Sequence, residues 1–323
     1  MAGINKTVVQ TDSVRECRFY MRYIANHFRT IDRENIVDNF SDTEICCRII
    51  NQHIRYVHTH EPSIEACIMN LKVQFLKSII PDDNFLWLKQ DKRATFWVWG
   101  ELALKGRMND EINEILTNEK GNNVGKYWYS EAKLNSSPIN HEQRFNLIID
   151  TIDFICSYSP IYASKMIIWL NNKLIEWRES QKIIIKNSWL TPENEKDCFK
   201  AYQDIKDHQE STKTSSNNNF YPVNIPEPLN AEEAYFSFYA MHDLWDTTLK
   251  ASRELNDRMS KNKSQMKYRR KKKENEMLSE ISSEASDKLK FISEFYKKSS
   301  VQVLENLISD RYKGIQIGIN NQD

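Results

Sequence analysis

A run of cations near the end of the chain is the clearest sign that this protein binds another molecule. Residues 261–273 read KNKSQMKYRRKKK; eight of the 13 are basic and none is acidic. Clustered cations attract phosphates, and binding of this kind weakens steeply with salt because counterions are released. Residues 261–323 hold 14 basic and nine acidic residues although the whole chain is neutral. This asymmetry predicts a nucleic-acid or membrane contact, with a solvated charge run as the alternative.

The segment that follows predicts a strand and two short helices. Residues 275–282, NEMLSEIS, are compatible with one strand. Ser282 and Ser283 can cap a helix whose apolar positions share one face: Ala285, Leu289, Ile292 and Tyr296. Ser299 and Gln302 have the form of a capping box. They open a second helix, which is expected to end before Gly314 and has the apolar stripe Val303, Leu304, Leu307 and Ile308.

So short a unit cannot bury a core alone, but two copies can pair their strands into a ribbon and pack their helices together. A two-stranded ribbon also fits the major groove of DNA. This organisation resembles the ribbon-helix-helix superfamily, the fold of the Arc and MetJ type of repressor, over about residues 272–313. The resemblance is strongest in KKSSVQVLENLISDRYKG. The preceding RMSKNKSQMKYRRKKK is similar to the basic lead-in of larger bacterial proteins such as the MatP-like organisers of the chromosome terminus.

The resemblance implies a homodimer on double-stranded DNA, with strand residues in the groove and the second helix starting at a phosphate. The candidate phosphate contacts are Lys267, Arg269, Arg270, Lys271, Lys272, Lys273, Ser299, Ser300 and Val301. The candidate base-reading residues are Asn275, Met277 and Ser279; the other strand register turns Glu276, Leu278 and Glu280 outward. The predicted dimer core comprises Ile281, Leu289, Ile292, Leu304, Leu307 and Ile308.

An enzymatic alternative rests on an Arg-x4-His spacing that occurs three times, in Arg22/His27, Arg48/His53 and Arg55/His60. The spacing is similar to the catalytic motif of the all-α HEPN ribonucleases, in which His and Arg act on the ribose hydroxyl and the phosphate. Tyr23, Ile49 and Tyr56 follow these arginines in place of the usual small polar residue. The histidines and cysteines show no metal-binding spacing, and no phosphate-binding glycine loop occurs. We therefore rank DNA binding above catalysis and expect no cofactor and no metal.

Residues 1–208 predict a multi-helical domain. One helical face carries Phe145, Ile148, Ile149, Ile152 and Ile155, and another carries Met166, Leu170, Leu174 and Trp177. Earlier helices are expected near 12–28, 42–57, 61–79, 83–105 and 108–118, and a further one should open at Thr191-Pro192-Glu193. The aromatic run 84–100 predicts a buried helix. We expect a linker at 209–229, a connecting helix at 230–260 capped by Asn230, a basic segment at 261–274 and the ribbon-helix-helix module at 275–314.

Composition sets the class of protein. Seven glycines and eight prolines in 323 residues favour long helices, so we predict a mainly α protein. None of the six cysteines forms a C-x-x-C pair, which predicts free buried thiols in a reducing compartment. No signal-like or membrane-spanning apolar run occurs, which predicts a cytoplasmic protein. Together these features predict a dimeric DNA-binding regulator or organiser of a bacterial chromosome, plasmid or mobile element. The alternatives are the ribonuclease and a helical interaction module with a solvated basic tail.

Overall fold

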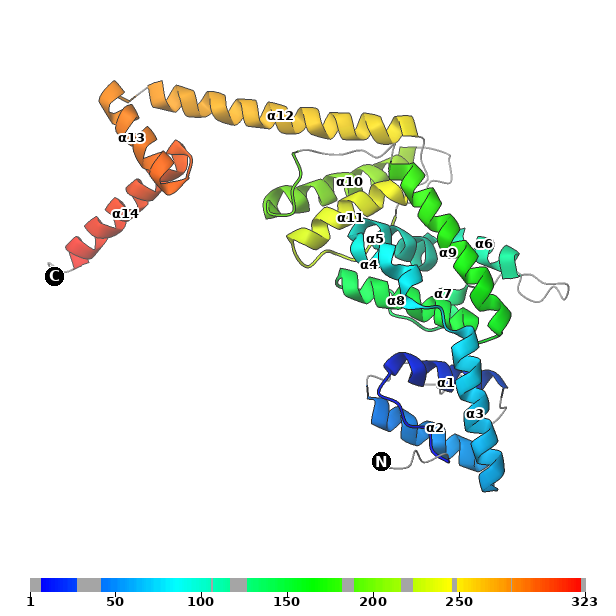
Figure 1. Cartoon of the computed structure of the whole chain (residues 1–323). Helices are drawn as coiled ribbons and strands as arrows, with labels where there is room; N and C mark the ends of the chain where they lie inside the picture. Colours follow the sequence, from blue (N-terminus) through cyan, green and yellow to red (C-terminus); the bar gives the residue numbers. More distant parts are fainter. Residues whose placement is uncertain are drawn as a thin grey trace. The chain divides into compact units, whose positions relative to one another are not determined.

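Helices dominate this chain, as its scarcity of glycine and proline predicts (Figure 1). The computed structural model describes residues 7–27, 42–105, 107–116, 127–181, 189–215, 223–245, 249–279 and 281–320, and within these ranges it contains no β-strand. The chain divides into two units, residues 1–249 and residues 250–323. Each unit is considered by itself below.

The first unit begins with three helices that share an apolar core: α1 (Val14–His27), α2 (Thr43–Val57) and α3 (Glu61–Ser78). Their limits match the predicted ranges closely because local signals set them. The side chain of Asp42 accepts hydrogen bonds from the amides of Glu44 and Ile45 and so begins α2. All six cysteines of the chain are free and buried, as predicted, and four of them, Cys17, Cys46, Cys47 and Cys67, belong to this core.

A series of helices continues the first unit: η2 (Asp82–Phe85), α4 (Leu86–Gln90), α5 (Lys92–Gly100), the π-helical η3 (Glu101–Lys105), α6 (Arg107–Leu116), α7 (Trp128–Glu131), α8 (His141–Cys156) and α9 (Pro160–Gln181). The aromatic run 84–100 is largely buried, as predicted, with Phe96, Trp97 and Trp99 inside. It is divided between several helices because Asp91 caps a new one at α5.

The predicted apolar stripes of α8 and α9 face the core. Ile148, Ile152 and Ile155 are fully buried on α8, and Trp177 of α9 stacks on Trp97 of α5 with ring centroids 5.3 Å apart. A spacing of three and four residues was therefore enough to find the inward face of both helices.

The segment predicted as a linker is packed into the first unit. α10 (Glu195–Ser215) extends into it, and Val223 and Ile225 beyond that helix are buried. The side chain of Gln209 accepts a hydrogen bond from the Val223 amide at 3.1 Å and donates one to the Met241 carbonyl at 3.0 Å. Residues 216–222 lie outside the described residues. α10 itself begins at Glu195, four residues after the predicted cap at Thr191, because Asn194 caps it.

Two arginine–carboxylate pairs hold α11 (Ala231–Asp243) inside the first unit. Arg144 of α8 donates to both carboxylate oxygens of Glu233, at 2.7 and 2.6 Å, and Arg93 of α5 makes two 2.7 Å bonds to Asp243. The predicted connecting helix 230–260 is therefore not one helix. α11 starts at the expected cap, Asn230, but it ends at Asp243 and belongs to the core.

The second unit contains α12 (Leu249–Ser279), α13 (Ser283–Tyr296) and α14 (Ser300–Asn320). The predicted strand is wrong: Asn275, Met277 and Ser279 lie in the last turns of α12. Lys, Arg, Glu, Met and Leu all favour helices, and a short polar–apolar pattern does not distinguish a strand from a helix end. The cap of α13 at Ser282 is confirmed, whereas α14 continues past Gly314 instead of ending before it.

A glycine-to-alanine change at the α5–α11 contact should destabilise the first unit. A Cβ at Gly100 would lie 2.3 Å from Cδ1 of Leu244, which is itself fully buried. We expect Gly100→Ala to cost about 1–3 kcal/mol of unfolding free energy by overpacking. All eight tryptophans precede residue 250, so tryptophan fluorescence during urea unfolding follows this unit. In a Leu244→Ala background the same change should cost much less; an equal cost would show that the clash is not the cause.

Candidate nucleic-acid surface

The basic run forms the middle of one continuous helix, α12. Lys261, Lys267, Arg269 and the lysines at 271–273 are exposed, whereas Lys263 is half-buried. The side chain of Arg270 lies outside the described part. A carboxylate follows the run at Glu276, 3.8 Å from the ammonium of Lys272. The cations thus occur on a rigid element at fixed spacing.

These cations surround the helix axis. At about 100° per residue, Lys263 and Lys267 fall on the side opposite to Lys261 and Lys272. A helix that is polar on every side is not a core element. Such a helix suits an environment with negative charge on more than one side.

Repulsion between the cations is part of the energetics of α12. Lys267 and Lys271 are four residues apart, as are Arg269 and Lys273, and like charges at this spacing destabilise a helix. A polyanion along the helix would offset that repulsion. An anion bound along residues 261–273 would therefore favour their helical form.

The predicted base-reading residues no longer form one set. Residues two apart on a helix are rotated by about 200°, so position 277 falls on the side opposite to the face that positions 275 and 279 share. Asn275 is exposed at the end of α12, next to the cations. The side chains of Met277 and Ser279 lie outside the described residues.

The predicted phosphate clamp lies at the turn between α13 and α14. Lys297 has a positive φ of 51°, and the capping box after it is confirmed: the Ser299 amide donates to Gln302 Oε1 at 3.1 Å, and the Gln302 amide donates to Ser299 Oγ at 3.3 Å. Ser300 is buried, with its hydroxyl 3.2 Å from that of Ser293. The Ser299 amide is thus already engaged by Gln302 Oε1 and is not free to bind a phosphate.

The predicted dimer core divides between two environments. Leu289 is buried, and Ile281, Ile292 and Leu304 are half-buried. Leu307 and Ile308 are exposed. Sequence spacing found the apolar positions but did not show which of them face inward within a single chain.

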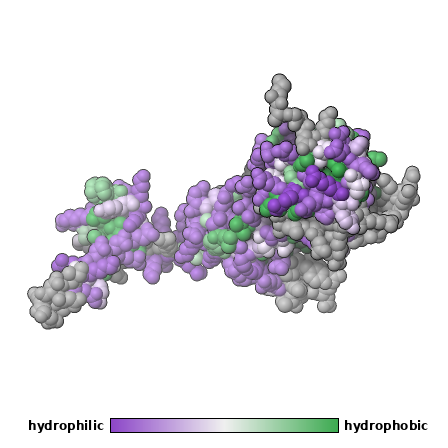
Figure 2. Space-filling model, turned by 90° about the horizontal axis from the view of Figure 1, so that it is seen from below, coloured by the Kyte–Doolittle hydropathy of each residue, from purple (hydrophilic) through white to green (hydrophobic). Residues whose placement is uncertain are grey.

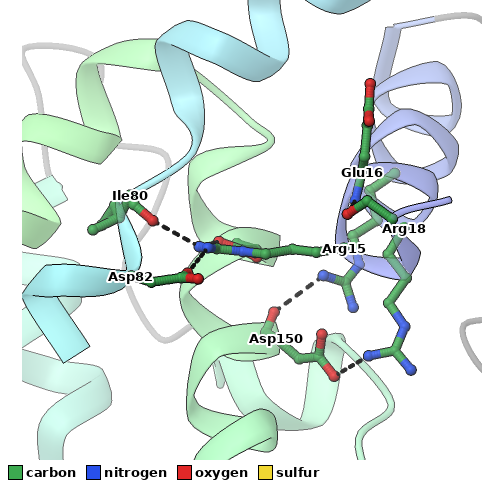
Figure 3. A network of polar contacts seen from close by, with 9 residues as sticks. Arg15, Glu16, Arg18, Ile80, Asp82 and Asp150 are labelled. Atoms are coloured by element: carbon green, nitrogen blue, oxygen red, sulfur yellow. Dashed lines mark hydrogen bonds and ion pairs between the residues drawn. The ribbon is translucent and has the colours of Figure 1, made fainter. Parts of the chain in front are cut away.

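A second cluster of charges, absent from the sequence-based predictions, lies in the first unit (Figure 3). Several of its residues, among them Arg15, Arg18 and Asp150, line a cavity of about 540 Å³. Arg15 of α1 contacts Asp153 of α8 through two bonds of 2.6 and 2.8 Å, and it also contacts Asp82 at 2.6 Å and the Ile80 carbonyl at 2.9 Å. Arg18 pairs with Asp150 at 2.5 Å. These guanidinium groups already have carboxylate partners, so the network is a fastening between α1 and α8.

The pKa of Asp153 reflects this position. Burial raises it above the ordinary value for an aspartate, and the hydrogen bonds and charge of Arg15 act in the opposite direction. For Arg15, burial lowers the pKa, but Asp153 and Asp82 outweigh this, and the net direction is upward. A buried pair with two short bonds depends on both partners.

The Arg-x4-His pairs of the ribonuclease alternative are not drawn together by the helices. A spacing of five residues places the two side chains about 140° apart on α1 and α2. Arg22 is buried and donates to the Asp150 carbonyl at 3.1 Å, whereas His27 stacks on Tyr23 with ring centroids 3.9 Å apart. His60 comes just before α3, outside the helix that carries Arg55.

The described residues contain no group of three or more His, Cys, Asp or Glu side chains placed to hold a metal ion. Among the same residues, no helix has the length and apolar character needed to cross a membrane.

Removing the buried partner of Arg15 should loosen α1. We expect Asp153→Asn to lower the unfolding free energy of the first unit by about 2 kcal/mol. Arg15 keeps its positive charge but loses the negative charge of its buried partner and one of the two oxygens that it contacts. Asp82→Asn is the matched control: its side chain is 84% exposed, and the change should cost less than about 0.5 kcal/mol. Urea unfolding followed by tryptophan fluorescence measures both. Equal costs would contradict the fastening role.

Comparison of the whole chain with known proteins identifies no relative. No family model, curated protein or solved structure matches this chain.

Proposed function

We propose that this protein binds double-stranded DNA through α12 and that it does so without catalysis. The observation that supports this most is that eight cations in 13 residues belong to one helix, with Lys261, Lys267, Arg269 and the lysines at 271–273 exposed. The major groove of DNA is about 12 Å wide, admits an α-helix and has a phosphate strand on each side. Cations on opposite sides of a helix match that environment.

The proposal keeps the DNA contact implied by the ribbon-helix-helix resemblance but moves it from a ribbon to a helix. Residues 261–279 span about 28 Å at 1.5 Å per residue, comparable with one turn of the duplex. Asn275 then lies on the element that enters the groove, where an amide side chain can pair with adenine. Base reading is assigned to the end of α12.

Duplex DNA fits this helix better than RNA or single strands do. The major groove of A-form RNA is too deep and narrow to admit a helix. Proteins that bind single strands stack bases on aromatic side chains, and Tyr268 is the one aromatic residue between 261 and 279. Double-stranded DNA is therefore the nucleic acid that we propose.

An acidic membrane surface fits less well. A helix that lies on a membrane has a broad apolar face opposite its cations. Between residues 261 and 273 the apolar side chains are Met266 and Tyr268. Two such residues among cations on all sides do not form that face.

Replacing the densest part of the run should reduce both affinity and its dependence on salt. In the test variant, Arg269, Arg270, Lys271, Lys272 and Lys273 all become Gln, which preserves helix propensity. Each lost phosphate contact should lower the slope of log K against log salt by roughly 0.9. Fluorescence anisotropy with a labelled duplex, over a salt series, measures that slope.

The control removes five exposed cations from the first unit instead, by changing Arg48, Arg55, Lys77, Lys89 and Lys196 to Gln. Both variants have the same net charge, so a general charge effect would change both slopes equally. We expect the control to keep the wild-type slope. An unchanged slope in the α12 variant, or an equal loss in both, would overturn the proposal, and the run would then be a solvated part of an interaction module.

A further inference from the structure

The helical hairpin α13–α14 leaves its largest apolar side chains at the surface (Figure 2). On α13 these are Phe291, Phe295 and Tyr296, and on α14 they are Leu307, Ile308, Tyr312 and Ile315. Their exposed fractions range from 49% to 73%. Scattered exposed apolar residues are normal, but seven within one hairpin of two helices form a patch.

The exposed residues follow the helical period. Phe291 and Phe295 are four residues apart, on the side of α13 opposite to the buried Leu289. On α14, Ile308, Tyr312 and Ile315 recur after four and three residues and so share a face. Each helix therefore has an inward side and a separate apolar outward side.

The inward side is too small to hold the hairpin together. Among the side chains that the structure describes here, the fully buried apolar ones are Leu289 and Val303, with Ile292 and Leu304 half-buried, and beside them the hydroxyls of Ser293 and Ser300 meet at 3.2 Å. Ordering a residue costs about 1–2 kcal/mol of backbone entropy, which two buried apolar side chains do not offset over a hairpin of this length. The outward apolar side must also be covered.

We propose that a second copy of this chain covers it, so that two α13–α14 hairpins form the core of a homodimer. A fully exposed aromatic side chain presents about 150–250 Å², so the three outward rings, exposed by about two thirds, with two outward isoleucines, offer on the order of 600 Å². A stable interface buries about 800 Å² on each partner. The outward apolar side thus supplies most of the area that a dimer needs.

Charge also favours a copy of the same hairpin. Residues 283–320 contain six Lys and Arg and five Asp and Glu, so two hairpins can face each other without net repulsion. Two copies of the basic run, in contrast, would repel each other. A symmetric dimer brings the same patch of both chains together. In this dimer Ile308, one of the predicted core residues, lies at the interface, whereas Leu289 packs within one chain.

The consequence for DNA rests on the proposed function. Each copy contributes one α12, so the dimer presents two basic runs and should bind a site with two halves. Dimerisation itself does not depend on DNA, which allows the two proposals to be tested separately.

Sedimentation of the full chain without DNA, from nanomolar to tens of micromolar concentration, tests the dimer. The variant is Ile308→Glu, and the matched control is Ile168→Glu on α9; the two isoleucines are 61% and 60% exposed. We expect wild type and the control to be dimers, and Ile308→Glu to weaken the dimer about 100-fold or more, because its charge would be buried without a partner.

Circular dichroism checks that Ile308→Glu keeps its helices, and Tyr312→Ser, which adds no charge, provides a second variant that should weaken the dimer less. A wild type that stays monomeric throughout the range overturns the inference. So does a dimer that only Ile168→Glu dissociates, or one that survives both Ile308→Glu and Tyr312→Ser. A dimer whose affinity for duplex is unaffected by the α12 substitutions would support this inference and contradict the DNA proposal.

Discussion

Eight cations within 13 residues cannot be buried in a protein core, and the organisation of this chain depends on that constraint. Removing one charge from water without a partner costs several kcal/mol, and residues 261–273 themselves contain no carboxylate, although Glu276 just beyond them lies 3.8 Å from Lys272. The run must therefore remain in contact with solvent or with an external anion. Residues 1–249 accordingly form a compact unit that does not include the basic run. The run itself lies on a helix that exposes it.

In the first unit, by contrast, charged side chains form ion pairs with one another inside the protein. Three of its arginines face a carboxylate each: Arg144 faces Glu233, Arg93 faces Asp243 and Arg15 faces Asp153. Arg144 also lies 4.0 Å from the centre of the Phe96 ring, so the ion pair and the aromatic core support each other. Ion pairs in this unit link helices, whereas the cations at positions 261, 267, 269 and 271–273 of α12 are exposed, with Lys272 3.8 Å from Glu276. That difference, rather than net charge, is the basis on which we propose α12 as the nucleic-acid surface.

Local signals made part of this structure predictable. Side-chain caps at Asp42, Asn230 and Ser282 began helices where expected, because each cap is decided by a few neighbouring residues. The predicted strand at 275–282 was wrong because eight residues with a mixed apolar pattern carry no local signal that ends a helix. The preceding helix, α12, therefore continues to Ser279. The packing of residues 223–243 depends on Arg144 and Arg93, which lie 89 and 150 residues before their carboxylate partners in the sequence. No local pattern reveals contacts over such separations. The basic run was found from composition alone, but its helical form and the outward apolar face of α13–α14 required the structure.

Photochemical cross-linking tests the DNA contact most directly, because it reports position rather than affinity. Tyr268 is exposed in the middle of the basic run and is well suited to react with a bromouracil-substituted duplex. If α12 lies in the groove, irradiation followed by peptide mapping should place the cross-links between residues 261 and 279, and Tyr268→Phe should change their pattern without abolishing binding. Cross-links confined to residues 1–249, or a duplex that binds without any cross-link to α12, would contradict the account.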